Sequence, residues 1–174
     1  MWSPDHSKRI RLLKNLTMRV EVNGKDLGAL ELPDDPVNTM IEWSQDSQAF
    51  YVQVGGNAIS GQVIAYAVVN AKLQELRAPK LVAEEFAKHH FCKERGNNLY
   101  AIRWQKGSQQ LLLMPEVYDT SDCGSDMGFT AGYLAEAATG KILKRYSSTQ
   151  IEAIQRECWP EKLLDQTPKK ADHK

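Results

Sequence analysis

Apolar and polar residues alternate along much of the chain with the period of two that β-strands show. The clearest case is the segment 18–32, which turns at Asn23-Gly24, a strong hairpin signal between alternating runs. Two further hairpins are predicted at 63–76, turning at 70–72, and at 133–146, turning at 139–140. The pattern therefore predicts a chain dominated by antiparallel strands.

A second kind of hairpin recurs around three tryptophans. Trp2, Trp43 and Trp104 each end an apolar stretch, and a polar turn and another apolar stretch follow. The spacings are about 40 and about 60 residues, and recurrence near 40 residues is typical of β-propeller blades. Asp and Ser in these turns can bond neighbouring backbone amides. Each unit thus combines two hairpins, or four strands, which is the content of one blade.

The hairpins fall into three blade-like units, at about 1–33, 38–77 and 98–147. Two helices interrupt them. One is expected over 80–91, opened by Pro79, and the other over 148–158, where Ser147 and Gln150 have capping-box spacing. We expect a single α+β, predominantly β domain over 1–164, and a disordered tail over 165–174, which has no large apolar residue.

The string Trp2-Ser3-Pro4-Asp5-His6-Ser7 resembles the blade signature of Tol-type and related bacterial β-propellers. Trp43-Ser44-Gln45-Asp46-Ser47 repeats it with Gln in place of Pro, and Trp104-Gln105-Lys106-Gly107-Ser108 keeps less of it. The resemblance implies blade-like sheets. Three units fall short of the four to eight that close a ring, and the first lacks a strand before Trp2. We therefore predict an open stack of sheets with helices covering exposed edges; the alternative is a fragment of a larger propeller.

Composition and charge narrow the possible functions. The 174 residues include 22 Lys+Arg and 22 Asp+Glu, so the chain has no basic excess of the kind that nucleic-acid binding usually requires. The longest uncharged apolar stretch, Val63–Val69, is far shorter than a membrane span. We expect neither nucleic-acid binding nor membrane insertion.

Three cysteines bear on the compartment. Cys92, Cys123 and Cys158 include no C-x-x-C pair, and their odd number allows one internal disulfide at most. Because Cys92 and Cys158 each close a predicted helix, we favour that pair; three reduced thiols are the alternative. No signal peptide follows Met1. We expect that an export signal was removed and that the protein is periplasmic or secreted, with a cytoplasmic location as the alternative.

Residues with catalytic or metal-binding potential are few. There is no Gly-x-Ser-x-Gly motif. His89 and His90 are adjacent at a predicted helix end, where the helix dipole favours a cation. With Cys92 they could begin a metal site, but no plausible second pair of ligands accompanies them. We expect no cofactor and no metal.

The loop 115–130 is the strongest candidate site. Asp119, Asp122 and Asp126 alternate there with glycines and with Tyr118 and Phe129. The spacing does not match a calcium-binding loop. Long acidic and aromatic loops on a rigid sheet commonly contact other proteins. These five residues are therefore predicted to bind a partner.

The prediction for function is a non-catalytic protein-binding module of the bacterial cell envelope. Its sharper form is an inhibitor or immunity-type protein that neutralises a partner effector, such as a toxin enzyme, by occluding it. Three alternatives stay open. They are a metal- or carboxylate-dependent hydrolase that uses the acidic loop, a propeller fragment, and a loop that is merely solvated.

Overall fold

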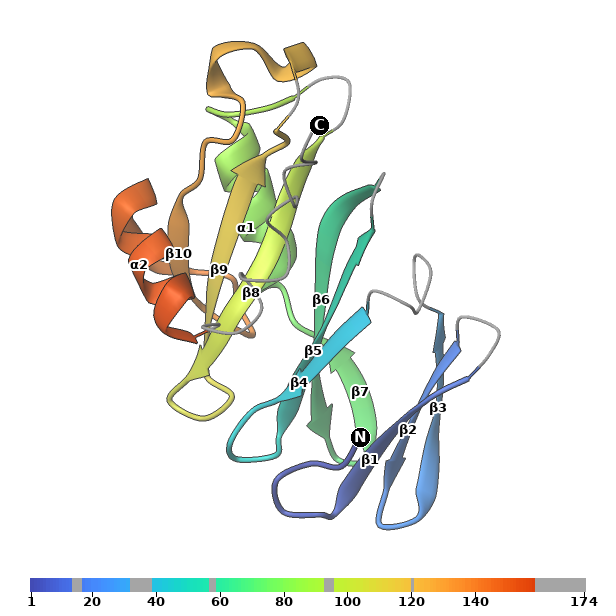
Figure 1. The fold of residues 1–174 in the computed structure, drawn as a ribbon. Helices are drawn as coiled ribbons and strands as arrows, with labels where there is room; N and C mark the ends of the chain where they lie inside the picture. Colours follow the sequence, from blue (N-terminus) through green and yellow to red (C-terminus); the bar gives the residue numbers. More distant parts are fainter. Residues whose placement is uncertain (14–16, 32–38, 57–58, 93–95, 120, 159–174) are drawn as a thin grey trace, which may run out of the picture.

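The chain folds into three antiparallel β-sheets stacked face to face (Figure 1). The computed structural model describes residues 1–13, 17–31, 39–56, 59–92, 96–119 and 121–158. Sheet A has the order β1-β2-β3, sheet B the order β4-β5-β6-β7, and sheet C the order β11-β10-β9-β8. The sheets do not close into a ring, so the predicted fold class is confirmed.

The strands of each sheet follow one another in sequence. Sheet A contains β1 (Lys8–Leu12), β2 (Thr17–Val22) and β3 (Lys25–Glu31). Sheet B contains β4 (Thr39–Trp43), β5 (Ala49–Gly56), β6 (Ile59–Val69) and β7 (Lys72–Glu75). Sheet C contains β8 (Asn97–Gln105), β9 (Gln110–Val117), β10 (Gly132–Glu136) and β11 (Ile142–Tyr146).

The predicted hairpin turns are present. Asn23 and Gly24 join β2 to β3 with φ of 49° and 77°. Asn70 and Ala71 join β6 to β7 with φ of 50° and 55°. Two successive left-handed residues are what a two-residue type I′ hairpin turn requires. These two turns therefore lie where the sequence pattern predicts them and have the backbone conformation that a tight hairpin needs.

Two hydrophobic cores separate the three sheets. Ile10, Met18 and Val20 of sheet A pack with Trp43 and Phe50 of sheet B. The opposite face of sheet B packs on sheet C through a larger core, which contains Tyr51, Ala65, Leu99, Ala101, Trp104, Leu111 and Leu113. Alternate residues of one strand, such as Phe50 and Tyr51, therefore enter different cores, as the pleat of a strand dictates.

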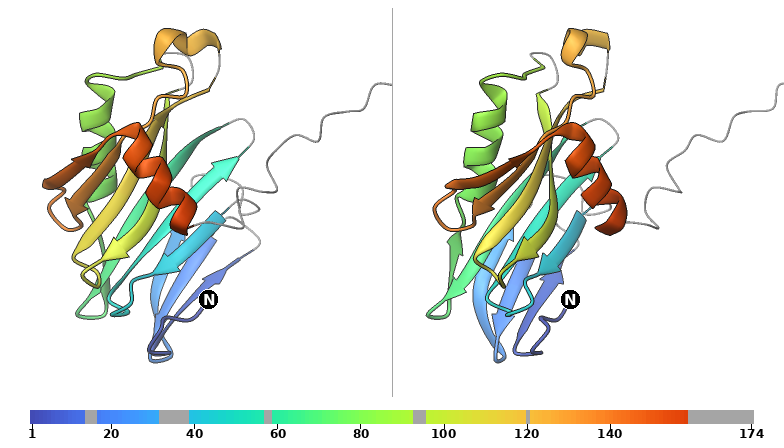
Figure 2. Two further views of the ribbon diagram at one scale, coloured as in Figure 1. Left: turned by 60° about the vertical axis from the view of Figure 1, so that its left-hand side comes forward. Right: turned by 90° about the vertical axis from the view of Figure 1, so that its left-hand side faces the viewer.

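The helices cover sheet faces and not the open edges predicted from the sequence. Helix α1 (Ala78–Ala87) places Val82 and Phe86 in the core between sheets B and C. Helix α2 (Ser148–Cys158) packs Ile151 on the outer face of sheet C (Figure 2). The expected span 80–91 is wrong at both ends of α1, whereas α2 and its capping box are confirmed, with Gln150 Oε1 accepting from Ser147 N at 3.1 Å.

The three tryptophans hold equivalent positions in the sheets. Trp43 pairs with Phe50, Trp104 with Leu111, and Trp2 with Arg9 through an isolated bridge. Trp43 faces sheet A and Trp104 faces sheet B, each toward the preceding sheet, and they are only 7% and 9% exposed. Trp2 lies on the face of sheet A that has no preceding sheet among the described residues, and it is 53% exposed.

The first two tryptophan turns have the same internal hydrogen bonds. Ser3 Oγ donates to Asp5 Oδ1 at 2.6 Å, and Ser44 Oγ donates to Asp46 Oδ1 at 2.7 Å. Asp46 Oδ2 also accepts from the backbone N–H of Ser108 in the third turn, at 2.8 Å. The three turns lie in a row at the lower end of the stack in Figure 1. The third turn has Gln105 and Gly107 where the second has Ser44 and Asp46. Its Ser108 amide is therefore bonded by Asp46 of the neighbouring turn.

The expected tail 165–174 lies outside the described residues. Within them, no helix has the length and apolar character needed to cross a membrane.

Candidate functional site

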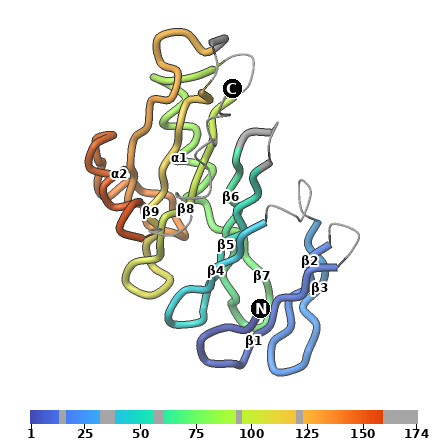
Figure 3. The backbone as a smooth tube through the Cα atoms, viewed as in Figure 1, coloured from blue at the N-terminus to red at the C-terminus, as the bar shows by residue number. Residues whose placement is uncertain are grey.

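The loop 115–130, called the disulfide loop below, is an excursion from sheet C that closes on itself at its base. Val117 N donates to Phe129 O at 2.9 Å, and Gly128 N donates to Val117 O at 3.1 Å. Between these bonds the chain forms the 3-10 segment η2 (Ser121–Asp126), interrupted at Gly124 by a φ of 67°. The loop stands at the upper end of the molecule, beside the end of α1 (Figure 3).

A disulfide joins the loop to the segment that follows α1. Cys92 bonds Cys123, with their Cα atoms 4.7 Å apart, and Cys158 is free. The preferred pair Cys92–Cys158 is therefore wrong. The reason is topological: α1 lies in the core between sheets B and C, whereas α2 lies on the opposite face of sheet C. The sequence pattern predicts a helix before each of these two cysteines, but it does not indicate on which face of sheet C each helix lies.

A histidine adds a second connection between the two segments. His90 Nδ1 lies 3.0 Å from Asp126 Oδ2, and the His90 ring stacks on Phe129 with centroids 4.1 Å apart. The Phe86 ring of α1 lies beside both of these rings. Its centroid is 5.3 Å from that of His90 and 6.2 Å from that of Phe129. Asn97 Nδ2 in turn donates to His90 O at 2.7 Å. The loop is thus held by a covalent bond, a hydrogen bond between His90 and Asp126, and an aromatic stack.

The structure brings part of the predicted set together. Asp126 and Phe129 both contact His90, and Asp119 lies beside Gly128. Tyr118 is half-buried at the base of the loop, whereas Asp119 is exposed. The side chain of Asp122 lies outside the described part of the chain. The described side chains of Asp119 and Asp126 therefore have different neighbours.

Sequence reasoning pointed to Phe129 but missed Phe91 and Met127 at this end of the molecule. Phe91, Met127 and Phe129 are 54%, 46% and 38% exposed. All three belong to the two segments that the disulfide joins. The signal in the sequence was Phe91 next to Cys92 in the polar stretch 89–92. It indicates a surface near the loop only once Cys123 is known to be the disulfide partner.

Burial and nearby acids shift one tyrosine at the base of the site. Burial raises the pKa of Tyr100, and the neighbouring carboxylate of Glu116 raises it further. Glu116 Oε2 also accepts from Asn98 Nδ2 at 3.1 Å. The Tyr100 phenol is therefore protonated at neutral pH.

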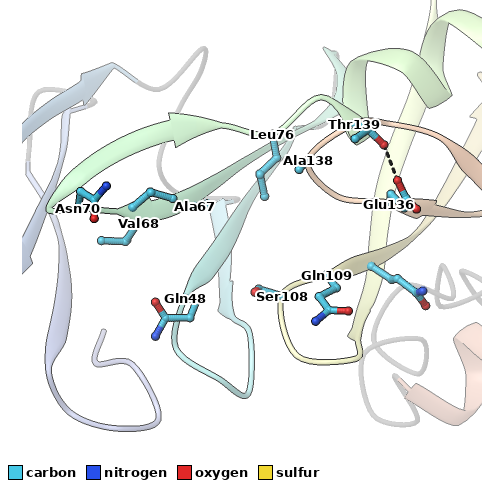
Figure 4. A pocket seen from close by; sticks show the side chains of 12 residues that line it. Gln48, Ala67, Val68, Asn70, Leu76, Ser108, Gln109, Glu136, Ala138 and Thr139 are labelled. Carbon is cyan, nitrogen blue, oxygen red and sulfur yellow. Dashed lines mark hydrogen bonds between the residues drawn. The ribbon is translucent and has the colours of Figure 1, made fainter.

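A cavity of about 620 Å³ lies elsewhere, between the lower ends of sheets B and C (Figure 4). Its polar lining is mostly uncharged and includes Gln48, Asn70, Ser108, Gln109 and Thr139. The carboxylate of Glu136 accepts from Thr139 Oγ1 at 2.8 Å. The cavity is lined by none of the five predicted site residues. The disulfide loop, in contrast, combines a disulfide, a His–Asp contact and an aromatic stack.

The described residues contain no group of three or more His, Cys, Asp or Glu side chains placed to hold a metal ion. Comparisons with known proteins find no matching family model, no matching curated protein and no matching solved structure. The resemblance to bacterial β-propeller blades therefore stays a prediction.

Proposed function

We propose that this protein is a non-catalytic protein-binding module whose binding surface is formed by the disulfide loop and the segment 90–92. The observation that carries the proposal is the exposure of Phe91, Met127 and Phe129 on two segments held together by a disulfide. Exposed apolar side chains that form one patch with a polar rim mark interaction surfaces. Aromatic residues and Met are enriched in such interfaces.

Preorganisation supports the same proposal. Ordering a mobile loop on binding reduces affinity, so a loop that is already held gains affinity by avoiding that cost. The Cys92–Cys123 bond and the stack of His90 on Phe129 supply this constraint. Asp119 and Asp126 place negative charge beside the apolar side chains, which favours a partner with a basic rim.

The proposed compartment is the bacterial cell envelope or the extracellular space. Structural disulfides persist in oxidising compartments and are rare in the cytosol. The Cys92–Cys123 bond is in keeping with export. Counting free thiols in protein isolated from its host under alkylating conditions tests this: export predicts one thiol, at Cys158, and a cytosolic protein would give three.

Binding is tested by capture from the native host followed by calorimetry with the identified partner. Phe91→Ser combined with Met127→Ser is expected to weaken binding at least tenfold, or about 1.4 kcal/mol. The matched control is Val69→Ser, which changes an exposed apolar residue at 46% exposure on sheet B. Equal loss of binding in the control, or none in the double variant, contradicts the proposed surface.

The sharper proposal is an inhibitor or immunity-type protein. It predicts that the captured partner is an enzyme and that one equivalent of this protein abolishes its activity. A partner without activity, or one that stays active in the complex, restricts the function to binding alone.

The contact between His90 and Asp126 favours the alternative, a hydrolase, because His–carboxylate pairs also occur in catalytic sites. The discriminating variant replaces Asp119, Asp122 and Asp126 together by Ala. Under the binding proposal it loses the partner, and the wild-type protein shows no turnover of ester, peptide or phosphodiester substrates. Turnover that this variant abolishes would replace the binding proposal by the hydrolase.

A further inference from the structure

The cavity between the lower ends of sheets B and C is lined by two glutamines at equivalent positions, Gln48 and Gln109. Each is the fifth residue after the tryptophan of its turn. Gln48 O accepts a hydrogen bond from Val68 N at 2.8 Å. In the same way, Gln109 O accepts from Ala137 N at 2.8 Å. Both side chains therefore start from backbone that its own sheet holds in the same manner.

The other polar groups of the lining are mostly neutral. Asn70 and Gln110 add two carboxamides, and Ser108 and Thr139 add hydroxyls. Among the described residues that line the cavity, Glu136 is the only one with a charged side chain. Because this lining offers no cation to pair with an anionic ligand, it favours a neutral one.

Aliphatic side chains complete the cavity and come from both sheets. They are Ala67, Val68, Val69, Leu76 and Ala138. In Figure 4, Gln48 and Gln109 lie below the side chains of Val68 and Leu76. A ligand in this cavity therefore meets apolar surface on one side and carboxamides on the other.

We propose that this cavity binds a neutral disaccharide unit. Sugar hydroxyls both donate and accept hydrogen bonds, and the C–H faces of sugar rings pack on aliphatic side chains. The carboxamides match the hydroxyls because each offers N–H donors beside an acceptor oxygen. Glu136 adds an acceptor: its carboxylate accepts from Thr139 Oγ1 at 2.8 Å, and a carboxylate can accept several hydrogen bonds at once.

The dimensions of the cavity fit a ligand of this size. Stacked sheets lie about 10 Å apart, so the equivalent backbones of Gln48 and Gln109 are separated by about this distance, which two linked sugar rings span. The volume of about 620 Å³ is within the range of about 300–1,000 Å³ that is usual for small-molecule sites. The disulfide loop stands at the upper end of the molecule in Figure 1, so sugar binding is independent of the protein contact proposed there.

The test is titration of the protein with neutral disaccharides, followed through the NMR signals of its backbone amides. The probes are maltose, cellobiose, lactose and N,N′-diacetylchitobiose. At least one is expected to shift the amides of Gln48, Gln109 and Thr139 saturably. The expected dissociation constant is about 1–10 mM, since neutral hydrogen bonds each contribute little net free energy. The amide of Asp126 in the disulfide loop is the internal control and should not shift.

Paired variants test the two glutamines. Gln48→Leu combined with Gln109→Leu should weaken binding of that sugar by about tenfold or more, because two hydrogen-bonding groups are lost. Both side chains are exposed, so the fold should stay intact. The matched control is Gln62→Leu, which replaces an exposed carboxamide of β6 outside the cavity and should leave the affinity unchanged.

A chemical control tests the role of the hydroxyls. The permethylated form of the same sugar keeps the rings and their apolar faces but loses every hydroxyl donor, and it should not bind. Three results would overturn the proposal. They are the absence of saturable shifts at the lining residues with all of the sugars, full affinity in the double glutamine variant, and equal binding of the permethylated sugar.

Discussion

The two ends of the sheet stack differ although they belong to similar units. At one end, Ile102, Leu112 and Met114 of sheet C form an apolar outer face covered by Ile151 of α2. At the other end, the outer face of sheet A carries arginines and carboxylates, with Trp2 exposed under the guanidinium of Arg9, 5.2 Å from the ring centroid. The outer face of sheet C is thus covered by a helix, whereas the outer face of sheet A carries charged side chains.

The two outer faces of the stack therefore differ in polarity. Every sheet has two faces, and an uncovered apolar face promotes association. Arg9 in sheet A pairs with Trp2, just as Phe50 pairs with Trp43 in sheet B and Leu111 with Trp104 in sheet C. The first of these positions therefore carries a charge where the other two carry an apolar residue.

The largest expected difference in the free energy of unfolding is between variants of the buried tryptophans and a variant of the exposed one. Trp43→Ala and Trp104→Ala are each expected to lower the free energy of unfolding by about 3–5 kcal/mol, because each leaves a cavity between two sheets. Trp2→Ala should cost less than about 1 kcal/mol, since Trp2 is 53% exposed. Urea unfolding of the three variants checks this, and equal costs would refute the difference between the ends.

The helix-covered end should depend on a single side chain. Ile151→Ala is expected to cost about 2–4 kcal/mol, since Ile151 is fully buried on sheet C. Gly132→Ala should also destabilise this end, because its new Cβ would lie 2.8 Å from the Ile151 side chain. Thermal unfolding with near-ultraviolet circular dichroism measures both, and wild-type stability in either variant would mean that α2 does not cover the sheet.

The tryptophan turns should make stability depend on pH in acid. Hydrogen bonds from Ser3 and Ser7 hold the pKa of Asp5 well below its usual value. Burial raises the pKa of Asp46, but donors from Ser44, Gln48 and Ser108 outweigh it and the net pKa is lowered.

Carboxyls with lowered pKa values in the folded state stabilise the fold above their unfolded pKa of 3.8 and lose that effect as pH falls. The melting temperature should therefore drop below about pH 4. Asp46→Asn should flatten this drop, and Glu31→Gln, on the exposed edge strand β3, is the matched control. An unchanged pH profile in Asp46→Asn would contradict the role of this turn.

The smallest effect is expected at the charged end. Arg11→Ala removes an exposed ion pair with Glu21 and should change the free energy of unfolding by less than about 1 kcal/mol. The same denaturant experiment at low and high salt measures it. A cost comparable with that of Ile151→Ala would mean that the charged face is buried by something that covers it.

The strands and hairpins could be predicted from the sequence because their signals are local. Alternation in 18–32 and the Asn23-Gly24 turn specify both strands and the connection between them. The capping residues Ser147 and Gln150 specify the start of α2 in the same way. In each case the residues that decide the structure are neighbours in the chain.

The predictions that were wrong or missing concern contacts between residues that are distant in the sequence. The disulfide partner of Cys92 depends on which side of sheet C each helix occupies, and no local pattern encodes this. Phe91 and Met127 are exposed on two segments that are distant in sequence and joined by this bond. The acidic residues were visible in the sequence, but the contact of Asp126 with His90 was not.

Trp2, Trp43 and Trp104 occupy equivalent positions in the three sheets, and of these three only Trp2 faces solvent. Hydroxyl-radical footprinting with mass spectrometry of the native protein measures this directly, because oxidation rates follow side-chain exposure. Rapid oxidation of Trp2 with strong protection of Trp43 and Trp104 is the predicted result. Protection of Trp2 equal to that of the other two, or rapid oxidation of Trp43, would contradict the stacked arrangement.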